Sequence, residues 1–183
     1  MDVRKAIEAR KSVRRFRDGG EVTADQLRLL VEAGRLACSW KNDQPWRFVA
    51  VRSGEQKKAL SDCVPEGNPG KKAVERAPVV IVLLAVPAEG EVHQDKPFWL
   101  VDCGIAGQQI YLQAVELGLG TVWVSLVDGP EVCRTLGAPD DWECVGLFPV
   151  GVPPEGSEEK KHTPRRPLEE VAFAEKVGRA LEL

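Results

Sequence analysis

The stretch PFWLVDCGIAGQQIYLQAVEL, residues 97–117, decides the architecture of this 183-residue chain. Its pattern predicts a long helix with apolar residues on nearly all sides, and Gly118 follows it as a natural C-cap. A helix of this kind is buried in a large core or in a subunit interface, and one domain of this size has limited room for it. We therefore expect this helix to meet a second copy of the chain.

The segments around this helix alternate between strand and helix patterns. The run from Pro78 to Val86 is almost wholly Val, Ile and Leu, which predicts a strand buried on both faces. A capping box, Thr23 to Gln26, begins a second helix. Further strands are predicted over 47–51, 121–126 and 144–150, helices over 2–10, from Glu55 and over 130–137, a loop over 64–72 and an amphipathic stretch over 168–181. The chain has no internal repeat, so we expect one α+β domain over residues 1–183.

Charge and hydropathy exclude several classes of partner. The chain has 28 acidic residues against 25 Lys and Arg, which gives a net charge of −3. It therefore lacks the excess of positive charge that is typical of proteins that bind nucleic acid. The longest apolar run, 78–87, is about half of a membrane span. The first eight residues lack the apolar core of a signal peptide. We expect a cytoplasmic protein with no membrane partner.

Cysteine and histidine patterns argue against a metal or a nucleophile. The five cysteines are odd in number and nowhere two residues apart, unlike a disulfide framework or a zinc site. Only His93 and His162 could act as a general base, so Ser-His-Asp and Cys-His mechanisms are disfavoured. Neither the dinucleotide fingerprint nor the P-loop is present. We expect no metal and no catalytic side chain.

Three polar segments could carry function. Residues 10–16, RKSVRRF, are either a solvated basic patch or an anion site, because arginines and a hydroxyl suit phosphate oxygens. Residues 39–48, SWKNDQPWRF, are either an ordinary polar loop with Trp46 in the core or a binding segment. In the second case, its Asn and Gln amides would form hydrogen bonds with the C=O and N–H groups along the edge of a ring. Residues 164–170, PRRPLEE, are either a charged tail or the remaining counter-charge for a phosphate.

In this order the segments resemble the nitroreductase family of FMN-dependent oxidoreductases, over nearly the whole chain. Residues 10–14, RKSVR, look like the opening phosphate and ribityl motif of the family. Residues 37–48 are similar to its small-Pro-Ser…Asn-x-Gln-Pro-Trp-x-Phe segment, with Cys38 where proline is common. Residues 102–120 are similar to its long central helix ending in Gly-Leu-Gly. The resemblance implies a central, mostly antiparallel sheet flanked by helices, in an intertwined homodimer.

The resemblance also implies a set of FMN contacts. Arg10, Ser12 and Arg14 would bind the phosphate, the ribityl chain and the pyrimidine edge, and Asn68 and Lys71 would approach the same edge. The complete set is Arg10, Lys11, Ser12, Arg14, Ser39, Trp40, Asn42, Gln44, Asn68, Lys71, Val124, Ser125, Arg165 and Arg166.

Some of these contacts would cross between subunits or come from the tail. Ser39 and Asn42 would reach the flavin of the other subunit, and residues 164–183 would complete the site with two arginines at the phosphate. Backbone donors around Val124 and Ser125 would approach flavin N5, with Ser125 standing where glycine is frequent.

By the same resemblance, the chemistry belongs to the cofactor. NADH or NADPH would reduce FMN by hydride transfer at N5, and a nitroaromatic, a quinone or a similar small acceptor would then be reduced. The chain is short for the family, which implies a more open pocket. Two alternatives stay open: a specialised flavin enzyme, such as a dehydrogenase, dehalogenase or flavin-fragmenting enzyme, and a flavin-binding or storage module without fast turnover.

Overall fold

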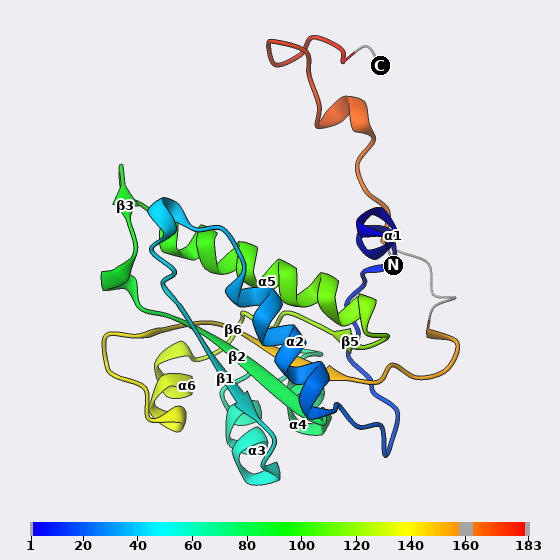
Figure 1. Cartoon of the computed structure of the whole chain (residues 1–183), viewed down its shortest axis with the longest axis vertical. Helices are drawn as coiled ribbons and strands as arrows, with labels where there is room; N and C mark the ends of the chain where they lie inside the picture. The colour runs from blue at the N-terminus through cyan, green and yellow to red at the C-terminus, as the bar shows by residue number, and fades with distance from the viewer. Residues whose placement is uncertain (1, 158–162, 182–183) are drawn as a thin grey trace.

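A computed structural model describes residues 2–157 and 163–181 of the chain (Figure 1). Its centre is a four-stranded sheet in the order β1-β2-β6-β5, and the three pairings are antiparallel. The strands are β1 (Trp46–Val51), β2 (Val79–Ala85), β6 (Glu143–Gly151) and β5 (Gly120–Thr121). Every residue of β2 is buried, as expected for a strand that is covered on both faces. The predicted α+β fold with an antiparallel sheet is confirmed.

Two layers of helices cover the sheet, and alternation along β2 explains why. Val79, Ile81 and Leu83 belong to the core cluster beneath α2 (Ala24–Arg35) and α5 (Phe98–Glu116). Val80, Val82 and Leu84 belong to the opposite cluster, with α3 (Gly54–Asp62), α4 (Lys71–Arg76) and α6 (Gly129–Leu136). Successive side chains of a strand point to opposite faces, so one apolar run supplies both cores.

The remaining elements are short. They are α1 (Val3–Ala9), η1 (Trp40–Asn42), η2 (Pro87–Glu89), the hairpin β3 (Val92–His93) with β4 (Lys96–Pro97), and η4 (Leu168–Glu170). The capping box predicted at Thr23 is present, with both reciprocal hydrogen bonds. No helix in the described ranges is long and apolar enough to span a membrane.

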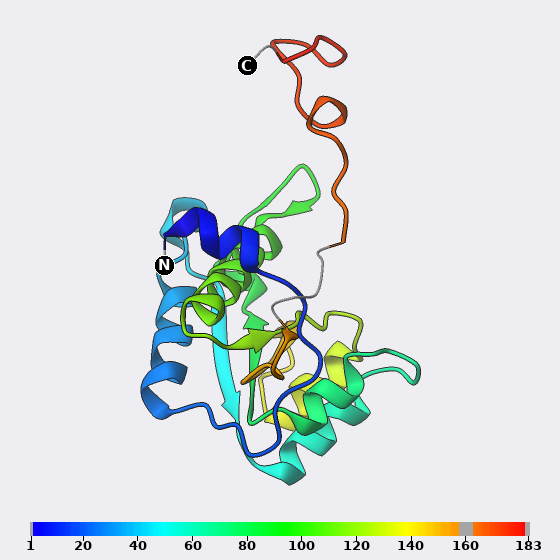
Figure 2. The same cartoon turned by 90° about the vertical axis from the view of Figure 1, so that its right-hand side faces the viewer.

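Three local predictions need correction. The strand expected over 121–126 is the two-residue β5, followed by one isolated bridge between Val124 and Leu147. Part of the loop expected over 64–72 is helical, because α4 begins at Lys71. Beyond the η4 turn, the amphipathic stretch over 168–181 forms no helix, and it extends away from the body of the chain (Figures 1 and 2).

Candidate functional site

Residues 10–17, called here the strap, form an extended segment that runs along the β5 edge of the sheet. The backbone N–H of Val13 donates to the carbonyl of Thr121 at 2.8 Å, and Ser12 pairs with Thr121 as a parallel bridge. Further along, the N–H of Arg17 donates to the carbonyl of Val152 at 2.8 Å. The strap is therefore held to β5 at Val13 and to the residue after β6 at Arg17, which fixes the backbone positions from which its side chains extend.

The Gly-Leu-Gly sequence after α5 makes this approach possible. Gly118 has a φ of +68°, the left-handed conformation that suits glycine at a helix end. A Cβ atom on Gly120 would lie 2.7 Å from the Cβ of Val13, closer than real side chains allow. Glycine at 120 is thus required for the strap to pair with β5.

Alternate side chains of the strap have different partners. The Arg10 guanidinium lies over the ring of Tyr111, 5.2 Å from its centroid. The Ser12 hydroxyl lies 3.3 Å from the Tyr111 hydroxyl. The ammonium of Lys11, between them, donates to the carbonyl of Ser157 at 2.6 Å. Arg10 and Ser12 therefore gather at one tyrosine, whereas Lys11 is bound elsewhere.

The loop before α4 packs against the turn that follows β5. A Cβ on Gly70 would lie 2.7 Å from a methyl carbon of Val124, so the Gly70 backbone packs directly against the Val124 side chain. Asn68 closes this loop, because its Oδ1 accepts the N–H of Gly70 at 2.8 Å. Arg14 of the strap lines a hollow together with Pro69. The structure thus brings the regions of Arg14, Asn68 and Val124 together.

Two predicted contacts at this position are already engaged in other bonds. The Lys71 ammonium lies 2.9 Å from a Glu66 carboxylate oxygen and donates to the carbonyl of Val64 at 3.2 Å. The N–H of Val124 donates to the carbonyl of Leu147 at 2.9 Å. Ser125 is exposed. The N–H groups of Val124 and Ser125 are both expected near flavin N5. Because the Val124 N–H is bonded to Leu147, the Ser125 N–H is the one of the two that remains available.

The second polar segment is a tight, preorganised turn. Lys41, Asn42 and Gln44 all have positive φ values, between 47° and 65°. The Ser39 hydroxyl accepts the N–H of Gln44 at 3.0 Å, and the Gln44 amide donates to the carbonyl of Asn42 at 3.1 Å. Strained backbone of this kind persists where the surroundings hold it, and it is common at functional sites.

Helix α5 anchors this turn at the end opposite the strap. The N–H of Trp40 donates to Oδ1 of buried Asp102 at 3.1 Å, and its ring packs on Phe98 with centroids 4.8 Å apart. Asp102 and Tyr111 are nine residues apart, which places them about 14 Å apart along the axis and on opposite faces of the helix. Within one chain the structure does not join the Trp40 turn to the strap.

The tail does not reach the strap of its own chain either. Arg165 and Arg166 are exposed, and Arg165 donates to the carbonyl of Thr163 at 2.9 Å. Figures 1 and 2 both show this segment extending away from the sheet and helices. A role for these arginines at the strap would therefore need a second copy of the chain. His162 lies outside the described residues.

Four of the five cysteines are poor nucleophiles. Burial raises the thiol pKa of Cys103 and of Cys144 to about 12 in each case, and it raises those of Cys63 and Cys133 as well. Thiols in such surroundings stay protonated near neutral pH. In the described ranges, no group of three His, Cys, Asp or Glu side chains could hold a metal ion.

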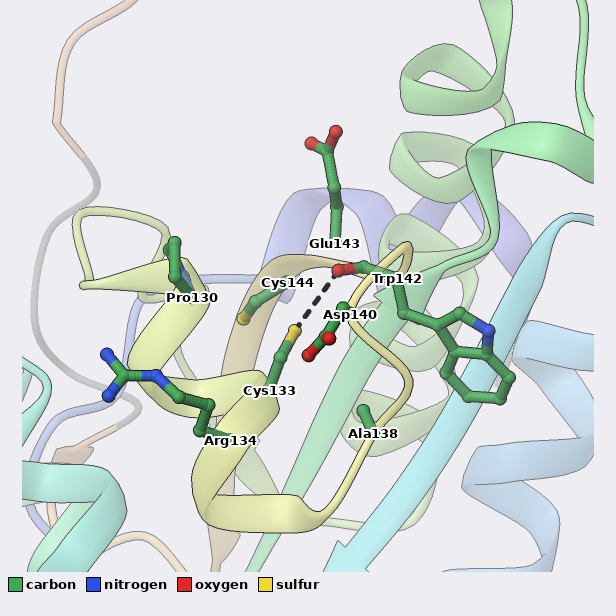
Figure 3. A pocket seen from close by; sticks show the side chains of 9 residues that line it. Pro130, Cys133, Arg134, Ala138, Asp140, Trp142, Glu143 and Cys144 are labelled. Carbon is green, nitrogen blue, oxygen red and sulfur yellow. Dashed lines mark hydrogen bonds between the residues drawn. The ribbon is translucent and has the colours of Figure 1, made fainter.

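A separate hollow lies between α6 and β6 (Figure 3), and its volume is about 350 Å³. Cys133, Cys144, Arg134 and Trp142 are among the residues that line it, and the Cys133 thiol donates to the carbonyl of Trp142 at 3.4 Å. None of the predicted site residues lines this hollow.

Two residues of the site are missing from the sequence-based set. Tyr111 meets Arg10 and Ser12, and its hydroxyl accepts the N–H of Trp123 at 3.2 Å. Tyr111 is the only tyrosine of the chain and stands within an apolar helix, and this is the sequence signal that could have identified it. The second missing residue is Asp102, an acidic residue in the first half of the same helix.

The model of the nitroreductase family matches residues 7–152, which include the strap, the Trp40 turn and all four strands of the central sheet. The chain belongs to this family. A relative in Methanothermobacter thermautotrophicus, named as a candidate NADH dehydrogenase/NAD(P)H nitroreductase, is 34% identical over 159 residues. The match covers 85% of this chain and 79% of the relative.

Solved nitroreductase structures share the fold. A nitroreductase family protein from Clostridium novyi NT superposes with a TM-score of 0.80 at 28% identity, covering 98% of this chain and 97% of the other. A nitroreductase candidate from Desulfovibrio desulfuricans, solved in complex with FMN, gives a TM-score of 0.81 at 26% identity, with coverages of 96% and 98%. The nitroreductase fold of this chain is thereby established.

Proposed function

We propose that this chain is an FMN-dependent oxidoreductase that takes electrons from NADH or NADPH. The observation that carries the proposal is the meeting of Arg10 and Ser12 at Tyr111, beside the turn against which the Asn68 loop packs. No ion pair joins Arg10 or Arg14 to a carboxylate in the described ranges, so both guanidinium groups can accept an anion. The FMN complex of the Desulfovibrio relative supports the choice of ligand.

The chain's own residues bind and orient the flavin. Arg10 and Ser12 donate to the phosphate and ribityl oxygens, because guanidinium and hydroxyl groups suit these acceptors. Arg14 and Asn68 hold the pyrimidine edge, where a fixed positive charge stabilises added electron density. Lys71 also binds the pyrimidine edge, once its ammonium leaves the Glu66 carboxylate for the flavin. Bound FMN supplies the hydride chemistry, and the protein supplies binding, orientation and charge.

The functional unit is a homodimer with FMN at the interface. Apolar side chains of α5 and α1 are exposed in the single chain: Leu100 is 43%, Val101 56%, Val3 70% and Ile7 56% exposed. A second copy that covers them brings its Ser39 and Asn42 turn, and its Arg165 and Arg166, to the strap. Such a dimer unites the two clusters that α5 keeps apart in one chain. An obligate interface of this type buries on the order of 2,000–5,000 Å² in total.

No protein side chain acts as the nucleophile or the general base in this proposal. The described cysteines with shifted pKa values are protonated at neutral pH, and His93 is exposed in the β3–β4 hairpin. We expect His93→Ala to leave kcat within about threefold, because essential acid–base groups contribute ~10²–10⁴-fold. The electron acceptor is a small molecule of the nitroaromatic or quinone class.

The test compares FMN binding in the wild type and in Arg10→Ala/Arg14→Ala. Each lost charge-assisted hydrogen bond weakens binding by ~1.5–3 kcal/mol, so FMN affinity should fall at least about tenfold. Arg28→Ala/Arg35→Ala on α2 removes the same charge and should bind FMN as the wild type does. Equal affinity in all three proteins contradicts the proposed site. FMN binding without NAD(P)H oxidation in the presence of a quinone would instead identify a storage module.

A further inference from the structure

A second hollow lies beyond the flavin contacts, between the strap and helices α3 and α4. Its volume is about 800 Å³, more than twice that of the hollow between α6 and β6. Its walls come from the strap and the turn after it, from α3, and from α4 with the residues on either side of that helix. The lining residues include the cations Arg14, Arg15, Arg17, Lys57, Lys72 and Arg76.

Positive charge dominates this hollow to an extent that the whole chain does not share. Asp18 is the one acidic residue in its lining, against six cations, although the chain has a net charge of −3. In residues 2–157 and 163–181, no carboxylate forms an ion pair with Arg15, Arg17 or Arg76. Unpaired like charges around one cavity repel each other, and a bound anion relieves that repulsion.

Lys57, which also lines the hollow, is a further group that a bound anion would stabilise. Its ammonium donates to the carbonyl of Ala77 at 2.6 Å, and burial lowers its pKa. Since burial penalises the charged form of Lys57, an anion in the hollow would favour the protonated ammonium. The backbone of Arg17 is held by its bond to Val152, and its side chain is among those that line the hollow.

We propose that this hollow binds a compact phosphorylated small molecule through a diphosphate group. Planar guanidinium groups donate pairs of parallel hydrogen bonds to phosphate oxygens, and three arginines besides Arg14 are available here. Two adjacent phosphates match several cations better than one carboxylate does. The hollow shares Arg14 alone with the proposed flavin contacts, so the inference does not rest on the flavin assignment.

The experiment is a calorimetric titration of pyrophosphate into the full chain, with and without saturating FMN. The wild type should bind about one pyrophosphate per chain in both conditions. Arg17→Ala/Arg76→Ala should weaken pyrophosphate binding at least about tenfold and leave FMN binding unchanged. Arg10→Ala should show the reverse pattern, with weaker FMN binding and unchanged pyrophosphate binding. Arg28→Ala/Arg35→Ala, with the same loss of charge, should match the wild type within about twofold.

Further titrations identify the source of the diphosphate and guard against loss of structure. If ADP binds more tightly than pyrophosphate, the ligand is a nucleotide, and equal binding indicates the diphosphate group alone. Arg17→Lys/Arg76→Lys keeps the charge but loses the paired donors, so it should bind with intermediate affinity. Pyrophosphate that displaces FMN, binding that survives in Arg17→Ala/Arg76→Ala, or no binding by the wild type would each overturn the proposal. Failure of FMN binding alone would leave it standing.

Discussion

The hydroxyl of Tyr111 lies 3.3 Å from that of Ser12 and also accepts the backbone N–H of Trp123 at 3.2 Å. One side chain of α5 therefore links the strap to the turn that follows β5. The same ring lies beneath the guanidinium of Arg10, at 5.2 Å. We propose that Tyr111 is a positioning residue, because it contacts the groups that are proposed to bind the phosphate and the ribityl chain.

Replacing Tyr111 by Phe tests this linkage. The ring and its edge contact with Phe148 are retained, so the change isolates the hydroxyl. The N–H of Trp123 loses its acceptor, and we expect a loss of ~1–3 kcal/mol in the free energy of unfolding. FMN affinity should fall severalfold, since Ser12 loses its partner. Urea unfolding and flavin titration provide the measurements, and a variant that matches the wild type in both would contradict the role.

Gly120→Ala should separate the strap from β5. The new Cβ would lie 2.7 Å from the Cβ of Val13, and relief of this overlap costs ~1–3 kcal/mol of stability. FMN affinity should fall with it, because Arg10 and Ser12 move with the strap. Gly129→Ala is the matched control, since the nearest atom to its new Cβ is 3.7 Å away. Equal FMN affinity in the two variants would show that the strap tolerates displacement.

The sequence alone predicts those helices and strands that are marked by a local pattern of side chains. The all-apolar run of β2, the capping box at Thr23 and the length of α5 are local signals, and the structure confirms each one. The strand predicted over 121–126 was wrong beyond its first residue. Val122 and Val124 are buried in the core, and Val124 forms a single bridge with Leu147 rather than part of a continuous ladder.

Contacts between distant segments could not be predicted in this way. Lys11 meets Ser157 from 146 positions away, and this pairing depends on the completed fold. In the proposed dimer, the contacts of Arg165 and Arg166 with a flavin would depend on a second chain as well. The flavin contacts of Lys11, Lys71, Arg165 and Arg166 stay predictions.

Asp102 should make stability depend on pH. Burial, with a smaller effect from Asp43, raises the pKa of this carboxyl, while the N–H of Trp40 opposes the shift. A raised pKa in the folded state favours the protonated form. The stabilisation is complete below the ordinary pKa of 3.8 and is lost as pH rises through the folded value. Asp102→Asn cannot titrate, so it lacks this loss.

Urea unfolding of the wild type and of Asp102→Asn at pH 4 and pH 7 measures the effect. The amide keeps an oxygen that can accept the N–H of Trp40. The wild type should therefore lose stability relative to the variant between the two pH values. The difference between the proteins is the quantity to compare, because other titrating groups contribute equally to both. A difference that is constant, or that changes in the opposite direction, would show that Asp102 is not desolvated in the folded protein.

Cys144 should react as a thiol with a strongly raised pKa. It lines the hollow between α6 and β6, and burial raises its pKa to about 12. Alkylation requires the thiolate, whose fraction rises tenfold for each unit of pH below the pKa. Iodoacetamide should therefore modify Cys144 about 100-fold faster at pH 9 than at pH 7. Mass spectrometry of the Cys144 peptide provides the rate, and Cys144→Ser removes that signal. A rate that levels off near pH 9 would reveal an ordinary thiol, and the hollow of Figure 3 would then be a place where cysteine chemistry could occur.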